Sequence, residues 1–254
     1  MTPVLQSSLP YDIWAPRGLP GLAPLDPVDW LIRDEAFDGQ MAARDHLLQR
    51  HRGQVLQMHE MARAPAVELL EMVVRDVWPE AGAQVRRCDG VEVDINREDP
   101  LGTLGRLAQE DFCILQKLGD EHVLTGAILC FPASWRLEEK FMTPLIGIHH
   151  PVGEYDAQLA TRVQRLFDGV KVGRPMWRFN ALWYDDPALF QPRSAQEPRR
   201  AHDAGKAAYL RSERQSILRL PETGAVVFSI HTYVLARALV LPLDGVAQTN
   251  MAAD

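Results

Sequence analysis

The sequence lacks the short motifs that mark the commonest enzyme mechanisms. It contains no G-x-S-x-G nucleophile elbow, no P-loop lysine motif and no G-x-G-x-x-G dinucleotide fingerprint. It also has no uninterrupted run of the roughly 18 apolar residues that a membrane-spanning helix needs, and its first residues have neither a basic start nor a long apolar core. We therefore expect a cytoplasmic protein without a membrane partner, which takes any catalytic chemistry from a cofactor.

Cysteine and runs of positive charge are also scarce. The three cysteines, Cys88, Cys113 and Cys130, show no C-x-x-C spacing and are odd in number, which favours free thiols in a reducing compartment over a cysteine zinc site. The formal net charge is -7 and no Lys/Arg run offsets phosphate repulsion, so a nucleic-acid partner is not expected. With 254 residues, 46% of them apolar, the chain can bury one large core.

The distribution of proline divides the chain. Six prolines fall within residues 1–27, which we interpret as an extended arm because a long helix cannot form there. Residues 28–240 are expected to form a single domain, and residues 241–254 a flexible tail. Within the domain, apolar spacing predicts helices over residues 29–52 and 65–77, then a loop with a short strand over residues 81–100.

Beyond Glu110 the helical period gives way to short apolar runs, which are typical of strands. Two runs flank Gly119-Asp120, a dipeptide that predicts a tight hairpin turn. The remaining elements expected are a connecting helix over 154–170, a strand over 176–184, and a closing hairpin over 209–221 and 224–234. This order indicates an α+β domain with an antiparallel sheet covered on one side by helices, whose uncovered polar face forms a ligand cup.

The closing hairpin carries a cluster of polar side chains in strand-like sequence. A four-residue loop over 221–224 sets Arg214 opposite His231, whereas a shift of one residue would set Gln215 there. Because buried charges must be paired or must hold an ionic ligand, the cluster predicts a pocket.

Three of the eight histidines lie in apolar stretches: His149, His150 and His231. The other five lie among charges or in a loop and are expected at the surface. A histidine in an apolar stretch is most often a hydrogen-bonded core residue. It is also the residue that a haem protein needs as an iron ligand, together with an apolar pocket and cations for the two propionates.

Several segments, in order, resemble one known family. They are Gln109-Glu-Asp-Phe-Cys-Ile-Leu115, Leu124-Thr-Gly-Ala-Ile-Leu-Cys-Phe-Pro-Ala-Ser-Trp135, Ile148-His-His-Pro-Val152, Trp177-Arg-Phe-Asn180, Leu210-Arg-Ser-Glu-Arg-Gln215 and Phe228-Ser-Ile-His-Thr-Tyr233. Over residues 100–234 the chain resembles the α subunit of haem-dependent oxidative N-demethylase and its relatives.

The resemblance implies a PAS-like domain that holds haem b and uses dioxygen to remove a methyl group from dimethylamine or a similar small alkylamine. It also implies partners, because in the characterised enzyme electrons come from NADPH through flavin and iron–sulfur subunits, and formaldehyde passes to a folate-binding subunit. None of these modules is recognisable in this chain. The alternatives are a haem-binding sensor or carrier without turnover, and a haem-free interaction domain.

The resemblance also implies roles for residues in the first of the histidine stretches. It makes His149 the proximal iron ligand, held by the rigid Pro151 and with His150 as a neighbouring competitor. Gly153 stands where the family pattern has a second proline.

In the hairpin, we expect the remaining contacts to haem and substrate. Arg211 and Arg214 are expected at the cofactor, because guanidinium forks bind carboxylates such as the haem propionates. Trp177, in the strand over 176–184, is also expected at the cofactor. An ion pair of the arginines with Glu213, and core packing of Trp177, are the alternatives. We expect His231 on the distal side, hydrogen-bonding iron-bound dioxygen or a water with Arg214 as the nearby donor. Glu213 and an aromatic face, from Trp177 or Tyr233, would bind the small ammonium group.

Overall fold

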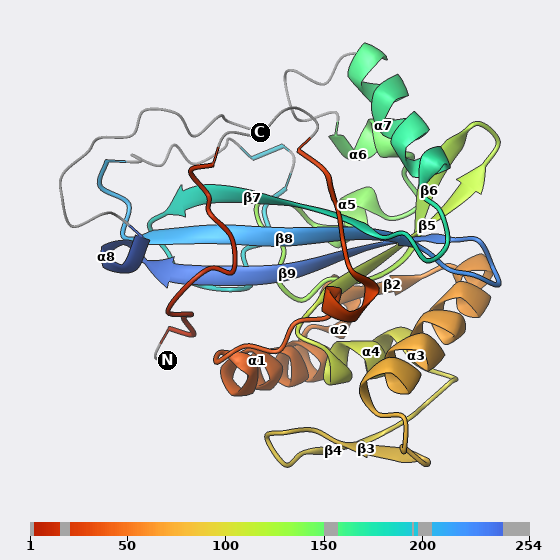
Figure 1. Ribbon diagram of the computed structural model, residues 1–254, viewed down its shortest axis with the longest axis horizontal. Coiled ribbons are helices and arrows are strands. Elements are labelled where there is room, and N and C mark those ends of the chain that lie inside the picture. The colour runs from red at the N-terminus through yellow and green to blue at the C-terminus, as the bar shows by residue number, and fades with distance from the viewer. Residues whose placement is uncertain (1–2, 16–20, 150–156, 195, 198–204, 241–254) are drawn as a thin grey trace.

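The structure is a computed structural model that describes residues 3–15, 21–149, 157–194, 196–197 and 205–240. Its centre is a seven-strand antiparallel sheet in the order β1-β7-β8-β9-β5-β6-β2 (Figure 1). The strands are β1 (Ala23–Pro24), β2 (Leu56–Met58), β5 (Asp111–Leu118), β6 (Glu121–Ile128), β7 (Met176–Tyr184), β8 (Tyr209–Arg219) and β9 (Val226–Ala236). A separate hairpin pairs β3 (Gln84–Arg86) with β4 (Glu92–Asp94). The predicted α+β class is confirmed.

Helices lie on both sides of this sheet, so the expectation that they cover one side only is wrong. They are α1 (Phe37–Arg50), α2 (Arg52–Val55), α3 (Arg63–Val77), α4 (Pro100–Leu107), α5 (Leu137–Lys140), α6 (Leu145–His149), α7 (Ala157–Gly169) and α8 (Arg237–Val240). In the view of Figure 1, α1, α3 and α4 lie below the strands, and α6 and α7 lie above them. Within the described ranges, no helix combines the length and the apolar character needed to cross a bilayer.

Both predicted hairpins are confirmed. β5 and β6 meet at Gly119, whose φ of 63° is the left-handed conformation that such a turn requires. β7 occupies the expected residues, and β8 pairs with β9 so that Arg214 lies opposite His231. The N–H of Leu220 donates to the carbonyl oxygen of Ala225 at 2.9 Å, which closes the loop and sets this register.

The first long helix begins later than its sequence pattern predicts. α1 starts at Phe37, because the segment before it is held by side chains rather than by helical hydrogen bonds. The N–H of Ile32 donates to Glu110 Oε1 at 2.7 Å, and the N–H of Asp34 donates to Gln109 Oε1 at 3.1 Å. Backbone donors satisfied in this way have no need of a helix.

The region before β5 holds more regular structure than expected. The predicted loop with one short strand contains both β3 and β4. α4 follows it, with Pro100 at its first position and Asp99 accepting a hydrogen bond from the N–H of Gly102. These are the usual signals of a helix start. The buried Leu101 and Leu104 then join the core.

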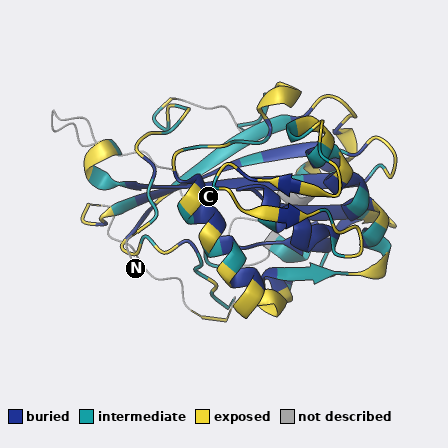
Figure 2. Ribbon diagram, turned by 90° about the horizontal axis from the view of Figure 1, so that it is seen from below, coloured by how far each residue is buried: buried dark blue, intermediate teal, exposed yellow. Residues whose placement is uncertain are grey.

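The core lies on both sides of the sheet. The larger cluster joins α3, α4 and the strands, and includes Leu69, Leu70, Val73, Leu104, Phe112, Ile114 and Ile128. A smaller cluster lies under α7 and includes Leu115, Phe167, Val170, Ile217 and Val226. Figure 2 shows the buried residues concentrated along the central strands, with exposed residues on the outer sides of the helices.

Alternation along the strands gives the sheet two faces with different side chains. The arm face carries Trp177, Phe179, Arg214, His231 and Tyr233. There the N-terminal segment packs on the sheet, with the ring of Tyr11 stacked on Phe179 at 4.1 Å between centroids. The α7 face carries Arg178, Asn180, Arg211, Glu213, Gln215 and Phe228.

The N-terminal segment is tied to the sheet at two places. The N–H of Gln6 donates to the carbonyl oxygen of Val234 at 2.9 Å, and the side chain of Gln6 accepts from the N–H of Val234 at 2.9 Å. Further on, β1 pairs with β7. The domain boundaries stay predictions, and the predicted tail lies outside the described residues.

Candidate functional site

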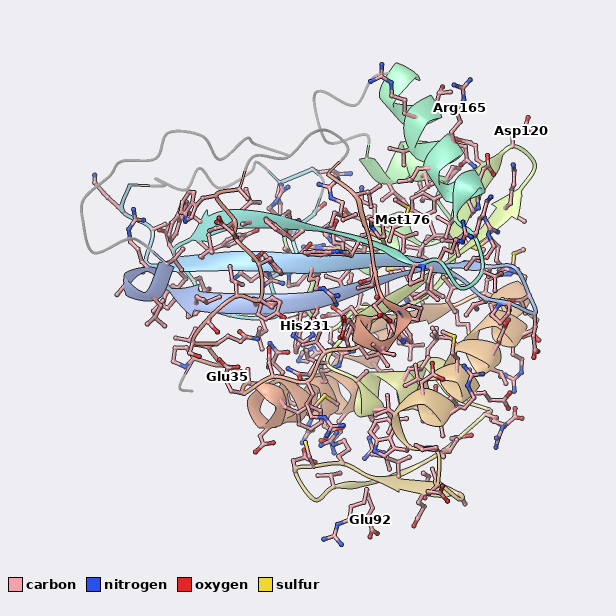
Figure 3. The ribbon with its side chains drawn as sticks, in the orientation of Figure 1. Glu35, Glu92, Asp120, Arg165, Met176 and His231 are labelled. Carbon is pink, nitrogen blue, oxygen red and sulfur yellow. The ribbon has the colours of Figure 1, made fainter. Side chains whose placement is uncertain are left out.

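His231 is labelled in Figure 3, below the central strands, and its imidazole is held between the carboxylates of Glu110 and Asp34 on the arm face. Its Nδ1 lies 3.1 Å from Glu110 Oε1, and its Nε2 lies 3.0 Å from Asp34 Oδ2. The side chain is 1% exposed. Because both ring nitrogens are engaged, an external ligand could reach His231 only after one of these bonds breaks.

The three groups shift one another's ionisation. Burial by itself favours the neutral imidazole, but the hydrogen bonds that the ring donates to Asp34 and Glu110 outweigh it and raise the pKa of His231 to about 9. Burial likewise opposes the charged carboxylate, but the hydrogen bond and the charge of His231 lower the pKa of Asp34 to about 2. His231 is therefore an imidazolium at neutral pH.

These carboxylates belong to a wider buried network that fastens α1 and the segment before it to the sheet. Gln109 Nε2 donates to Asp34 Oδ1 at 2.8 Å, and Gln6 Nε2 donates to Asp34 Oδ2 at 2.9 Å. Next to it, the fully buried Arg44 donates to Asp111 Oδ1 at 2.7 Å and to three backbone carbonyl oxygens. The polar run at the start of β5 therefore acts as a structural junction.

A pocket of about 610 Å³ opens on the arm face beside this network. Tyr11, Trp177 and Tyr233 give it an aromatic wall. Arg214 also lines it, with its guanidinium carbon 5.2 Å from the centroid of the Trp177 ring. The rim is mostly acidic and carries Asp26, Asp29, Arg33, Asp34 and Glu35.

On the α7 face, Glu213 is a buried carboxylate, 8% exposed. Its Oε2 accepts hydrogen bonds from Asn180 Nδ2 and from Gln215 Nε2, each at 3.1 Å. Its N–H donates to Asn180 Oδ1 at 3.1 Å. Within the described ranges Glu213 forms no ion pair. The alternative in which it pairs with Arg211 or Arg214 is therefore wrong, because Arg211 binds carbonyl oxygens and Arg214 lies over Trp177.

Arg211 lies on the same face but is committed to the backbone. Its guanidinium donates to the carbonyl oxygens of Phe131 at 2.6 Å, Leu189 at 3.0 Å and Ala188 at 3.3 Å. These bonds fasten the loop before β8 to the strand. The predicted contact of Arg211 with the cofactor stays a prediction.

Lys140 fixes the backbone just before His149, the predicted iron ligand. α6 ends at His149, whose side chain lies outside the described residues, as do His150, Pro151 and Gly153. Lys140 is buried, and its Nζ donates to the carbonyl oxygen of Ile148. Burial lowers the pKa of Lys140. The backbone immediately before His149 therefore has a defined anchor.

A family model described as haem-dependent oxidative N-demethylase, alpha subunit-like, matches residues 21–241. The chain belongs to this family. The match extends beyond the segments that carried the resemblance, to include the segment before α1 with Asp34 and the helix α8.

The α7 face carries side chains of the kinds that would be needed to hold the haem implied by the family's description. Phe228 in β9 and Gln215 in β8 are only half-buried, although both strands lie in the middle of the sheet. Trp135 and Ile148 are partly buried apolar side chains packed beside the same cluster. Arg178 provides a cation on this face. An apolar plane with charged edges suits haem, which needs one protein ligand from the axial direction.

The residues proposed for the demethylase-like site are divided between the two faces. Glu213 and Arg211 lie on the α7 face, on the side of the sheet that also carries α6. Trp177, Arg214 and His231 lie on the arm face. Their roles at haem stay predictions, and the contacts observed for them are with the arm pocket and the carboxylate network.

Four contributors were missed by the sequence reasoning. Glu110 lay within a quoted segment, and an acidic side chain at the start of an apolar strand could have marked it as a buried partner. Asp34, Tyr11 and Lys140 carry no comparable local signal, because their importance comes from residues far away in the chain. Among the described residues, no cluster of three or more His, Cys, Asp or Glu side chains could hold a metal ion.

Proposed function

We propose that this chain is the haem-binding subunit of an oxygenase that removes a methyl group from a small alkylamine, such as dimethylamine, with dioxygen. Membership of the haem-dependent oxidative N-demethylase alpha subunit-like family supports the reaction class. The single observation in the structure that supports an amine substrate is Glu213, a buried carboxylate that two amide groups orient and that no cation of the described residues neutralises.

In this proposal the α7 face would hold haem b, and His149 would be the protein ligand of its iron. The strand run β6-β5-β9-β8-β7, with α5, α6 and α7 inserted between β6 and β7, supports a PAS-like domain with its cofactor under the inserted helices. Bound haem supplies the activation of dioxygen. Lys140 holds the carbonyl of Ile148, which orients the ligand-bearing end of α6.

Glu213 binds the ammonium group of the substrate. Asn180 and Gln215 each donate to the same carboxylate oxygen, Oε2, so Oε1 is left to accept a hydrogen bond from the alkylammonium. Phe228 offers an aromatic ring on the same face. Trp177 and Tyr233, the aromatic residues first considered for this role, lie on the arm face.

The balance of the reaction requires partners. One dioxygen, two electrons and two protons convert the N-methyl group to formaldehyde and the demethylated amine, with one water released. The electrons come from NADPH through flavin and iron–sulfur subunits, and a folate-binding subunit takes the formaldehyde. The words "alpha subunit" in the family's description support this dependence on further subunits.

The test is oxygen uptake by the haem-loaded protein with a chemical reductant and dimethylammonium. We expect a Soret band, substrate-dependent uptake, and a KM for dimethylammonium raised roughly tenfold or more by Glu213→Gln, because a hydrogen bond to a charged group is lost. Haem content should not change in this variant. Glu222→Gln, at an exposed position in the β8–β9 turn, is the matched control.

Three results would count against the proposal. A protein without a Soret band after haem loading would be a haem-free interaction domain. A Soret band without amine-dependent uptake would favour a sensor or carrier. An unchanged KM in Glu213→Gln would move the ammonium site elsewhere.

A further inference from the structure

Arg214 is a buried guanidinium whose contacts among the described residues are with the aromatic side chains of Trp177 and Tyr233. It is 7% exposed and lies with its guanidinium carbon 5.2 Å from the centroid of Trp177. In the part of the chain that the structure describes, it makes no hydrogen bond and no ion pair. A buried charge without a counterion is costly, so its presence in the wall of the arm pocket indicates a place prepared for an anion.

The nearby carboxylates do not supply that counterion. Asp34 is bound by His231, Gln6 and Gln109. Glu35 accepts from both the N–H and the hydroxyl of Ser7, at 2.7 and 2.6 Å. Both carboxylates line the pocket, but the hydrogen bonds observed for them are with groups other than Arg214. The N–H groups of Arg214 have no hydrogen-bond acceptor among the described residues, and a guanidinium group can bind a carboxylate through two hydrogen bonds.

The charged side chains that line the pocket limit the net charge that a ligand can carry. Four carboxylates, from Asp26, Asp29, Asp34 and Glu35, line the pocket together with two arginines, Arg33 and Arg214. A dianion would be repelled by this excess of negative charge, whereas a positively charged group near the rim would be attracted. The aromatic wall formed by Tyr11 and Tyr233 suits an apolar side chain carried beside two adjacent charged groups.

We infer that the arm pocket binds a small zwitterion, an amino acid with an apolar side chain, whose carboxylate is held by Arg214 and whose ammonium group faces the acidic rim. This site lies on the opposite face of β8 from Glu213, because adjacent residues of a strand point to opposite sides. It is therefore separate from the proposed amine-oxidising site and does not rest on it.

Calorimetric titration of the haem-loaded protein with three related probes tests the inference. L-phenylalanine carries both charges, 3-phenylpropionate lacks the ammonium group, and phenethylammonium lacks the carboxylate. We expect L-phenylalanine to bind most tightly and phenethylammonium most weakly. Arg214→Gln should weaken binding of both carboxylates at least tenfold and leave phenethylammonium within twofold, because only the carboxylates contact the guanidinium.

The matched control is Arg97→Gln, which removes an exposed arginine that does not line this pocket. It should change the affinity for L-phenylalanine by less than twofold. If Arg214→Gln does not fold, Arg214→Lys keeps the charge without the planar fork, and we expect it to weaken carboxylate binding severalfold. The order of affinities of the three probes for the unaltered protein tests the inference without any variant.

Three outcomes overturn the inference. The first is no binding of either carboxylate by the unaltered protein at millimolar concentration. The second is equal affinity in Arg214→Gln. The third is loss of haem from Arg214→Gln together with no carboxylate binding by the unaltered protein, which would assign Arg214 to a haem propionate. Haem content is read from the Soret band, so failure here is distinguishable from failure of the proposed oxygenase activity.

Discussion

His231 Nε2 lies 3.0 Å from Asp34 Oδ2, although 197 positions separate the two residues in the sequence. This contact joins the segment that precedes α1 to the central strand β9. Glu110 completes the arrangement from β5, so one imidazolium holds three distant parts of the chain together.

The His231 contacts predict stability that falls in alkaline solution. The pKa of His231 rises from 6.5 to about 9 on folding. This contribution is complete below pH 6.5 and is lost as the pH rises through 9. The difference in free energy of unfolding between the unaltered protein and His231→Gln should shrink by about 3 kcal/mol from pH 6 to pH 10. Urea unfolding across this range measures it.

His122→Gln is the control for that experiment, because burial lowers the pKa of His122. His122 is buried and not at the surface as the sequence predicted, so it should destabilise the protein as the pH falls, which is the opposite direction. If the difference in free energy of unfolding between the unaltered protein and His231→Gln stays constant from pH 6 to pH 10, the assignment of His231 as an imidazolium is contradicted.

His149→Ala should abolish haem retention if His149 is the axial ligand. The measurement is the Soret absorbance per protein after haem loading and desalting, with circular dichroism to show that the variant is folded. His46→Ala, which removes an exposed histidine on α1, should keep full absorbance. An unchanged spectrum in His149→Ala would reassign the ligand to His150 or His231.

The buried pair of Arg44 and Asp111 should be among the costliest to break. Both residues are 0% exposed, and the guanidinium also donates to three carbonyl oxygens. We expect Arg44→Met to lower the free energy of unfolding by about 3–5 kcal/mol, because it leaves a buried carboxylate without its cation.

The exposed pair of Arg97 and Glu71 provides the comparison, with 61% and 53% of their side chains accessible. Arg97→Met should cost less than about 1 kcal/mol. Equal costs for the two variants, measured by urea unfolding, would show that the Arg44 network does not stabilise the fold.

The three thiols should differ in reactivity. Cys88 is exposed, whereas Cys113 and Cys130 are buried. Burial raises the pKa of both buried thiols, that of Cys130 to about 12, and thiolate is the reactive form. A thiol reagent should therefore modify one cysteine in the folded protein and all three in denaturant. Reaction of more than one thiol under native conditions would indicate that the sheet opens.

The predictable part of the fold lay where neighbours in sequence are neighbours in space. The β5–β6 and β8–β9 hairpins followed from turn residues and alternation, and the loop length gave the pairing of Arg214 with His231. The predicted start of α1 was wrong because Ile32 donates its N–H to Glu110, a residue far away in the sequence. α4 was missed although Asp99 and Pro100 are ordinary helix-start signals.

The candidate site divides in the same way. Alternation along β8 already required Glu213 and Arg214 to point to opposite faces, yet the sequence reasoning placed both at one site. That Glu213 has two amide partners and no cation among the described residues depends on β7 lying beside β8. The empty hydrogen-bonding edge of Arg214 became apparent only when Trp177 and the arm were placed around it.

The sequence by itself therefore determined the family, the α+β class and the pairing within the two long hairpins, because motifs, apolar period and turn chemistry act over a few residues. Only the tertiary structure decided the charge state of His231, the bonding of Arg211 to carbonyl oxygens, and the surroundings of the polar side chains on the two faces of the sheet. The physical reason is that burial and hydrogen bonding depend on contacts between distant residues, and these contacts form only when the sheet closes.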